Sequence, residues 1–254
     1  IVIAQDITRY GTDLYGKRCL AELCRRISEI DGVEWIRLHY TYPDQFDDEL
    51  IDEIASNPKI VKYLDIPIQH INNKILKNMN RHGTGDDIRA LFKPLRRRIP
   101  GLVLRTSLIA GLPGEGEAEF AQLCDFLKEY KLERVGAFAF SPEEGTRAAE
   151  MEYPDTEIAR QRADMVAEIQ SRIMDDYNES CIGKTMQVLC EGYDPDEESY
   201  YGRTFADSPD IDGKIWFTAE KHIKTGDFAD VRVVDAYDGE LVGVLEEEYN
   251  DDCE

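Results

Sequence analysis

Residues 107–115 read SLIAGLPGE, a stretch in which an apolar strand runs into a glycine-rich turn. The run before it, Leu102–Thr106, is apolar enough for a parallel strand buried on both faces. After the turn, Phe120, Leu123 and Leu127 recur at the spacing of a helix. The stretch therefore predicts a strand, a glycine turn and a helix, and α/β proteins place ligands at such strand ends because glycine lets the backbone approach closely.

The same alternation of strand-like and helical runs extends up to about residue 150. The expected strands are 1–4, 33–40, 63–68, 101–110 and 134–140, and the expected helices are 16–30, 47–56, 74–79, 86–98 and 115–130. Alternation of this kind predicts a parallel sheet with crossover helices. It fits a full or partial (β/α) barrel over 1–153, and an open doubly wound sheet is the alternative.

The remaining third of the chain has a different pattern. An amphipathic connecting helix is expected over 154–181, with Thr156 as a plausible N-cap. Short strand-like runs separated by Asp, Gly and Pro turns then follow at 185–190, 200–205, 214–217, 230–237 and 241–245. Five such runs predict a small antiparallel β-barrel of OB-like type over 182–248, followed by an acidic tail at 249–254.

The chain is strongly acidic, with a formal net charge of −22 over 254 residues. Between residues 182 and 248, six Lys and Arg stand against seventeen Asp and Glu, a net charge of −11. Such a surface repels phosphate backbones, so we expect no strong nucleic-acid binding. The negative charge could simply keep the protein soluble, and the more specific explanation is that it binds a basic partner. No run approaches the ~20 apolar residues of a membrane span.

The six cysteines are Cys19, Cys24, Cys124, Cys181, Cys190 and Cys253. They form no C-x-x-C or C-x-x-x-C-x-x-C cluster, so we expect no metal to be bound by them. With no signal-peptide pattern and no disulfide spacing, we expect a reducing, cytoplasmic location. The chain begins at Ile1 within an expected strand, and we expect it to be a piece of a longer protein.

Polar residues follow the ends of consecutive predicted strands. The candidates are Gln5 and Asp6, His39 with Tyr42, Gln69 and His70, Arg105 inside its strand, the glycine turn, and the residues around Phe140. One polar strand end is routine, whereas five on successive βα units predict a ligand pocket at a barrel mouth. The sequence carries neither a phosphate-binding loop nor a nucleophile elbow, so P-loop and classical hydrolase functions lack support.

Each candidate also has a structural interpretation. His39 and His70 are each more often hydrogen-bonded structural histidines than acid–base catalysts. Asp6 could cap a short turn. Arg105, if buried, needs an anionic partner, which a ligand carboxylate or a glutamate would supply.

Several of these strings together resemble the methylthiotransferases of the radical S-adenosylmethionine (SAM) superfamily. They are AQD at 4–6, DIPIQH at 65–70, RTSLIAGLPGE at 105–115 and FSPEEGT at 140–146. The β-rich segment from Gly183 resembles the TRAM domain of the same enzymes. The resemblance covers essentially the whole chain and implies a partial (β/α) barrel of radical SAM type.

The resemblance also implies cofactors: SAM, and a [4Fe–4S] cluster held by a C-x-x-x-C-x-x-C loop after the first barrel strand. A second cluster belongs to an N-terminal domain, which makes two in the full-length protein. The sequence contains neither that loop nor that domain, and its first strand matches the second strand of the barrel. We therefore expect this chain by itself to be catalytically inactive.

Matched position by position, the resemblance implies a set of cofactor-binding residues. They are Gln5, Asp6, Gln69, Arg105, Ile109, Gly111 and Phe140. The first two would lie near the methionyl amino group of SAM, and Gln69 near the ribose or the carboxylate. Ile109 and Gly111 would lie against the adenine and Phe140 at its edge, while Arg105 would meet the methionyl carboxylate.

Two branches of the family compete, and His39 and Tyr42 would line the substrate side in either. One branch modifies an adenosine of transfer RNA, and the other methylthiolates the β-carbon of an aspartate in small-subunit ribosomal protein S-twelve. Residues 201–213 resemble the second branch, and a domain of charge −11 also suits a basic protein better than RNA. A third possibility is a noncatalytic acidic module that docks a basic ribosomal protein.

Overall fold

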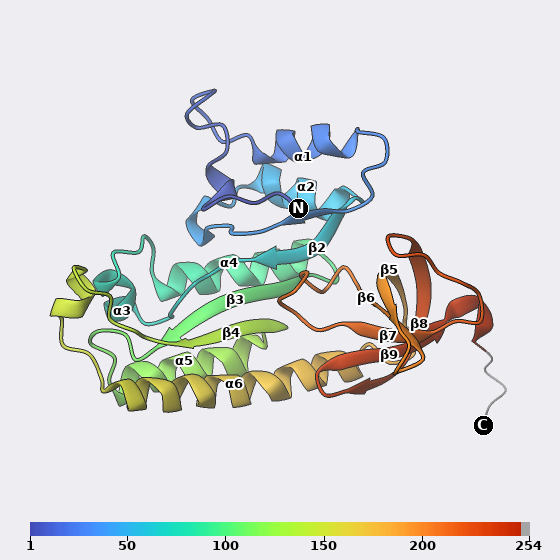
Figure 1. The fold of residues 1–254 in the computed structure, drawn as a ribbon. Helices are drawn as coiled ribbons and strands as arrows, with labels where there is room; N and C mark the ends of the chain where they lie inside the picture. The colour runs from blue at the N-terminus through green and yellow to red at the C-terminus, as the bar shows by residue number, and fades with distance from the viewer. Residues whose placement is uncertain (250–254) are drawn as a thin grey trace. The chain divides into compact units, whose positions relative to one another are not determined.

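The structure, a computed structural model, describes residues 1–249, so the predicted acidic tail lies almost entirely outside the described residues. The chain divides into two compact units, Ile1–Gln170 and Ser171–Glu254 (Figure 1). The division falls inside one long helix, α6 (Thr156–Glu179). Each unit is described by itself.

The first unit is built on a four-stranded parallel sheet whose strands follow chain order. The strands are β1 (Ile36–Leu38), β2 (Ile60–Asp65), β3 (Val103–Ala110) and β4 (Arg134–Ala139). A doubly wound sheet reverses its strand order at a switch point, whereas the strands of a (β/α) barrel are sequential. The order therefore confirms the predicted partial barrel and excludes the doubly wound alternative.

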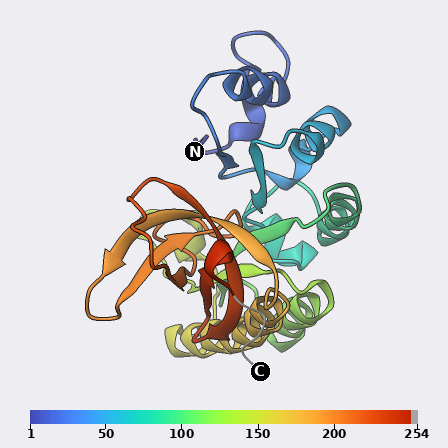
Figure 2. The ribbon, with the colours of Figure 1, turned by 90° about the vertical axis from the view of Figure 1, so that its right-hand side faces the viewer.

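Helices connect and flank the strands of this sheet. They are α1 (Leu20–Ser28), α2 (Asp48–Ser56), α3 (Asn73–Asn78), α4 (Gly85–Arg98), α5 (Glu117–Tyr130) and the first part of α6. Figure 2 shows α1, α2, α4 and α5 along one face of the sheet, as the crossovers of a barrel require. Local sequence sets their starts: the Thr84 hydroxyl accepts from Asp87 N at 3.2 Å, and the Asp87 carboxylate accepts from Thr84 N at 2.8 Å.

Two predictions at element ends were wrong. The strand expected over 1–4 is only a single parallel bridge between Val2 and Leu38, because the chain then turns into a 3₁₀ segment, η1 (Ile7–Arg9). At the start of α6, Asp155 rather than Thr156 caps the helix, since its Oδ1 accepts from Glu157 N at 2.8 Å. The Asp155 carboxylate, one residue before the predicted cap, reaches the unpaired backbone N–H groups in the first turn of α6.

The side chains of strand β3 alternate between the two faces of the sheet. Leu104, Thr106, Leu108 and Ala110 are buried, and the alternating residues Arg105, Ser107 and Ile109 are half-buried. Since successive side chains point to opposite faces, the second set lies on the face turned away from the helices, which we call the inner face. The register pairs Asp65 with Arg105 and Ile109 with Phe138, so these residues share that face.

The second unit contains a closed five-stranded barrel with the order β5-β6-β7-β9-β8. Its strands are β5 (Thr185–Asp194), β6 (Ser199–Arg203), β7 (Ile215–Thr218), β8 (Phe228–Tyr237) and β9 (Glu240–Leu245). All five predicted strands are present within a few residues of their expected bounds. The pairing of β7 with β9 is parallel and the other pairings are antiparallel, which is compatible with an OB-like barrel.

The barrel closes around side chains that alternate along its strands. Val188, Ile215, Phe217, Val231 and Val233 are each at most 1% exposed. The alternating residues face outward, whereas twelve of the seventeen acidic residues between 182 and 248 lie outside the strands, in the connections and in the segment after β9. The alternation of period two that predicted these strands is thus the physical basis of the barrel core.

Candidate functional site

An ion pair occupies the inner face where β2 ends against β3. Arg105 Nη1 lies 2.8 Å from Asp65 Oδ1, and the two side chains are 13% and 3% exposed. The other carboxylate oxygen of Asp65 accepts from Tyr40 N at 3.3 Å. Buried Arg105 therefore has a protein partner, an aspartate from the neighbouring strand, where the sequence suggested a ligand carboxylate or a glutamate.

An apolar cavity of about 350 Å³ lies at the carboxyl ends of β3 and β4. Its lining comprises Asn78, Met79, Ile109, Leu112, Pro113, Phe138, Ala139, Phe140, Ser141 and Ala148. Two predicted site residues, Ile109 and Phe140, thus meet in one cavity. Phe138, which is 54% exposed, adds a second aromatic ring. A cavity of this size with apolar walls can hold a flat heteroaromatic group such as a nucleobase.

Gly111 directly follows β3, next to the cavity-lining residue Leu112. It has φ +80°, a conformation that favours glycine. A Cβ at this position would lie 2.3 Å from Ala159 Cβ, so no side chain fits without movement. The glycine lets the turn pack directly against the first turn of α6.

Gln69 is held beside β3 by its backbone. Its N–H donates to Ser107 O at 2.9 Å, and its carbonyl accepts from Ile109 N at 2.9 Å. The residue is not a glycine, yet its φ is +67°. Such strained positions occur where the surrounding structure over-determines them, often at binding sites.

The remaining predicted residues line neither this cavity nor the second one described below. Gln5 is exposed, and the Asp6 carboxylate caps η1 by accepting from Thr8 N at 3.0 Å. His39 is 7% exposed, with its ring centroid 6.2 Å from that of Tyr63. The Tyr42 ring lies under the guanidinium of Arg81 at 4.6 Å. The structure thus brings Ile109 and Phe140 together, with Gly111 and Gln69 beside β3.

Sequence reasoning missed Asp65 and Glu115 as parts of this site. Asp65 ends β2, and the rule that a buried arginine needs an acid could have identified it. Glu115 closes the glycine-turn string, but nothing in the local pattern says that it is buried. Its contacts are described below.

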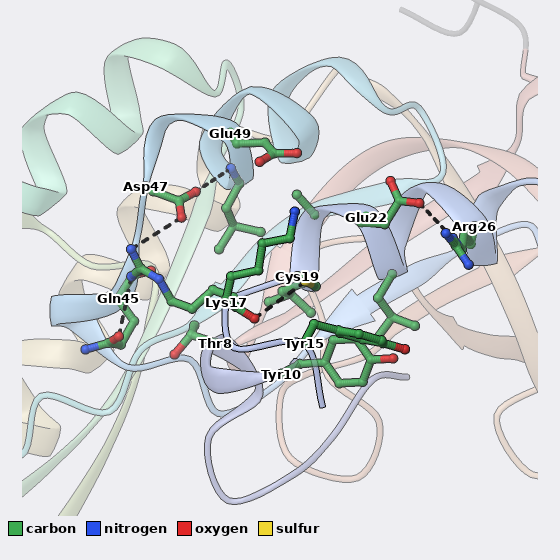
Figure 3. A pocket seen from close by; sticks show the side chains of 15 residues that line it. Thr8, Tyr10, Tyr15, Lys17, Cys19, Glu22, Arg26, Gln45, Asp47 and Glu49 are labelled. Atoms are coloured by element: carbon green, nitrogen blue, oxygen red, sulfur yellow. Dashed lines mark hydrogen bonds and ion pairs between the residues drawn. The ribbon is translucent and has the colours of Figure 1, made fainter. Parts of the chain in front are cut away.

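A second cavity, of about 380 Å³, lies between η1, α1 and the start of α2 (Figure 3). It contains none of the predicted site residues. Its charged side chains are largely paired with neighbours: Arg18 Nη1 donates to Gln45 O at 2.8 Å, and Arg26 Nε lies 2.7 Å from Glu22 Oε1. With its charges compensated in this way, the cavity does not specify a ligand class.

The thiols of the described residues are not arranged for metal binding. Within 1–249, no group of three or more His, Cys, Asp and Glu side chains could hold a metal ion. Burial raises the pKa of Cys24 to about 12, and it also raises the pKa of Cys124 and Cys190. The cysteines of the described residues thus lie apart from one another and do not form the three-thiolate set that an iron–sulfur cluster needs.

Among residues 1–249, no helix combines the length and the apolar character that crossing a bilayer requires.

Family models match both parts of the chain. The model for the radical SAM superfamily matches residues 10–127, and the model for the TRAM domain matches residues 182–245. The chain therefore carries a radical SAM domain followed by a TRAM domain. The first match spans β1 to β3 and the glycine turn, and the second spans the five-stranded barrel.

Curated relatives share sequence similarity with this chain over almost its whole length. It is 48% identical to "Ribosomal protein uS12 methylthiotransferase RimO" of Acetivibrio thermocellus, over 96% of this chain and 54% of that protein. The protein of the same name from Clostridium acetobutylicum is 43% identical over 98% of this chain and 56% of its own length. These matches confirm the predicted resemblance. The chain spans about half the length of the curated relatives it matches.

A solved structure, coproporphyrinogen III oxidase (HemN) from Escherichia coli, is described as a radical SAM enzyme. It is 17% identical, with a TM-score of 0.47 over 61% of this chain and 36% of that chain.

Proposed function

We propose that this chain is part of a radical SAM methylthiotransferase that adds a methylthio group to the β-carbon of an aspartate in ribosomal protein uS12. The observation that carries the proposal is the identity of 48% over 96% of the chain to relatives with that printed name. The similarity spans both domains, so it covers the cavity as well as the acidic barrel. An activity on a ribosomal protein also implies a cytoplasmic location.

The first unit contains a binding site suited to the nucleoside of SAM. The apolar cavity with Ile109 and Phe140 suits the adenine, and it opens where β3 and β4 end. Arg105 on the inner face suits the methionyl carboxylate while Asp65 holds its guanidinium in place. SAM, when bound beside a reduced [4Fe–4S] cluster, supplies the oxidising equivalent that activates a C–H bond. The residues of this chain bind the nucleoside, orient it and exclude water.

The iron–sulfur clusters belong elsewhere in the proposed protein. None of the described side chains fits a cluster, and the printed sequence has no C-x-x-x-C-x-x-C motif. We propose that both clusters of the full-length protein are held by residues outside this sequence. The roles of Gln5, Asp6, His39 and Tyr42 also stay proposals, since these residues lie outside the cavity.

The acidic barrel supports a basic protein partner. Its net charge is −11 between residues 182 and 248, and three of its six cations are already paired within the domain. Arg203 pairs with Glu191, and Arg232 Nη2 lies 2.6 Å from Glu246 Oε1. Few cations remain to contact phosphates, so a basic ribosomal protein is a better partner than transfer RNA.

The catalytic proposal predicts a dependence on sequence outside this chain. The full-length protein, reconstituted anaerobically with iron and sulfide and reduced with dithionite, should convert SAM to 5′-deoxyadenosine. The 254-residue chain treated identically should give none, because it has no set of cluster ligands. Chromatographic detection of 5′-deoxyadenosine is the measurement. Absence of the product with the full-length protein would exclude the radical assignment.

The partner proposal predicts salt-sensitive binding of protein rather than RNA. The chain should retain purified uS12 in a pull-down at low ionic strength and release it at ~0.5 M salt, where charges are screened within a few ångströms. A gel shift with transfer RNA serves as the matched comparison. Tight binding of transfer RNA would support the adenosine-modifying branch instead, and no binding of uS12 at low salt would contradict the partner.

A further inference from the structure

A buried pair of polar side chains lies beneath the glycine turn, and the proposed function does not use it. His70 and Glu115 are both 0% exposed, and His70 Nε2 lies 3.2 Å from Glu115 Oε2. His70 follows the end of β2, and Glu115 follows the turn after β3. Polar groups buried this completely need a reason, because burial without partners costs free energy.

Hydrogen bonding defines which nitrogen of His70 carries the proton. Asn72 N donates to His70 Nδ1 at 3.0 Å, so Nδ1 is the acceptor. A neutral imidazole then carries its proton on Nε2, which faces the Glu115 carboxylate. Nε2 and Glu115 Oε2 lie 3.2 Å apart, but their geometry makes no hydrogen bond between them.

The other oxygen of Glu115 holds the turn itself. Glu115 Oε1 accepts from Gly111 N at 3.0 Å and from Arg162 Nη1 at 2.9 Å. Arg162, on α6, is 7% exposed in its side chain and also donates to the carbonyl of Glu115 at 3.1 Å. One carboxylate oxygen thus joins the glycine turn to α6.

We infer that Glu115 is a positioning residue that fixes the Gly111 amide, with Arg162 holding its carboxylate and His70 packed beside it. A glycine turn is otherwise flexible, and flexibility would have to be lost when a ligand binds. Leu112 and Pro113, the next two residues, line the apolar cavity. The network therefore pre-forms one wall of that cavity. The identity of the ligand rests on the proposed function, but the constraint on the turn does not.

The test uses the full-length protein and two readouts that do not depend on turnover. The first is the dissociation constant for S-adenosylhomocysteine, measured by equilibrium dialysis. The second is amide hydrogen exchange of segment 109–116, followed by mass spectrometry. The variants are Arg162→Gln, Glu115→Ala and Glu115→Gln. Arg160→Gln is the matched control, because Arg160 is exposed on the same helix and has no ion pair among the described residues.

Arg162→Gln and Glu115→Ala should weaken S-adenosylhomocysteine binding about tenfold, as loss of an outer support of a binding site typically does. Both should also speed exchange of segment 109–116. Glu115→Gln keeps an acceptor for Gly111 N and should retain more of the protection than Glu115→Ala. Arg160→Gln should change neither readout.

A merely structural role predicts a different result. The variants would then unfold at lower denaturant concentration, while exchange of segment 109–116 and ligand affinity at low denaturant stayed at the wild-type values. That outcome would overturn the inference. If the wild-type protein did not bind S-adenosylhomocysteine, the proposed cofactor would be wrong, and the exchange readout would still decide the positioning role.

Discussion

Replacing Gly111 with alanine should lower the free energy of unfolding of the first unit by about 3 kcal/mol. The left-handed conformation at φ +80° costs an alanine about 1–2 kcal/mol. The new Cβ would lie 2.3 Å from Ala159 Cβ and 2.8 Å from its Cα, and overpacking of this kind adds about 1–3 kcal/mol. Urea unfolding gives the measurement. Trp35 fluorescence in a Trp216→Phe background reports the first unit, since the chain has 2 Trp.

Gly101→Ala is the matched control for this substitution. Gly101 also has a positive φ, +72°, but a Cβ there would meet nothing within 4 Å. The Gly101→Ala substitution should therefore lower the free energy of unfolding only by the cost of the left-handed backbone conformation, about 1 kcal/mol. Equal losses at the two positions would show that close packing of the glycine turn on α6 contributes nothing to stability.

Replacing Asp65 with alanine should destabilise the first unit by about 3–5 kcal/mol, because it removes the carboxylate from a buried ion pair. The Arg105 guanidinium would keep its charge at a position where its side chain is only 13% exposed. Tyr40 N would lose its acceptor at the same time. The same Trp35 unfolding experiment measures the loss, and binding of S-adenosylhomocysteine should weaken in parallel.

Two comparisons show how much of the expected loss of stability is due to the burial of this ion pair. Asp52→Ala removes one partner of the exposed Arg98 pair, where Asp52 is 71% exposed, and should cost at most about 1 kcal/mol. The double variant Asp65→Leu, Arg105→Met should recover most of the stability, since apolar replacements of buried pairs are often neutral. A loss below about 1 kcal/mol for Asp65→Ala would contradict the assigned role of the pair.

The architecture could be predicted from sequence because periodicity is local. A continuous apolar run identified β3, glycine and proline identified its turn, and helical spacing identified α5. The five strands of the barrel followed from short apolar runs and turn residues. The prediction of a strand over 1–4 was wrong, and the reason is also local. Asp6 caps η1 and turns the chain away after one bridge, and a four-residue apolar run cannot reveal this.

The site was harder to predict because its contacts join distant segments. Arg105 needs an acid by general reasoning, but only the register of β2 on β3 identifies Asp65. His70 and Glu115 lie on different βα units, and no local pattern pairs them. The left-handed backbone of Gln69 is likewise imposed by β3 and not by its own side chain. Ile109 and Phe140 were predicted as site residues through the family resemblance, and the structure places both at the carboxyl ends of the neighbouring strands β3 and β4.

Helix α6 has a practical consequence for anyone who dissects this protein. The division at Gln170 and Ser171 falls inside this helix, so its last residues belong to the second unit. A truncation that starts at Ile182, where the TRAM match begins, would discard Asn178, whose amide donates to Gly239 O at 2.9 Å. The smallest autonomous piece of the acidic half should therefore include the last two turns of the helix.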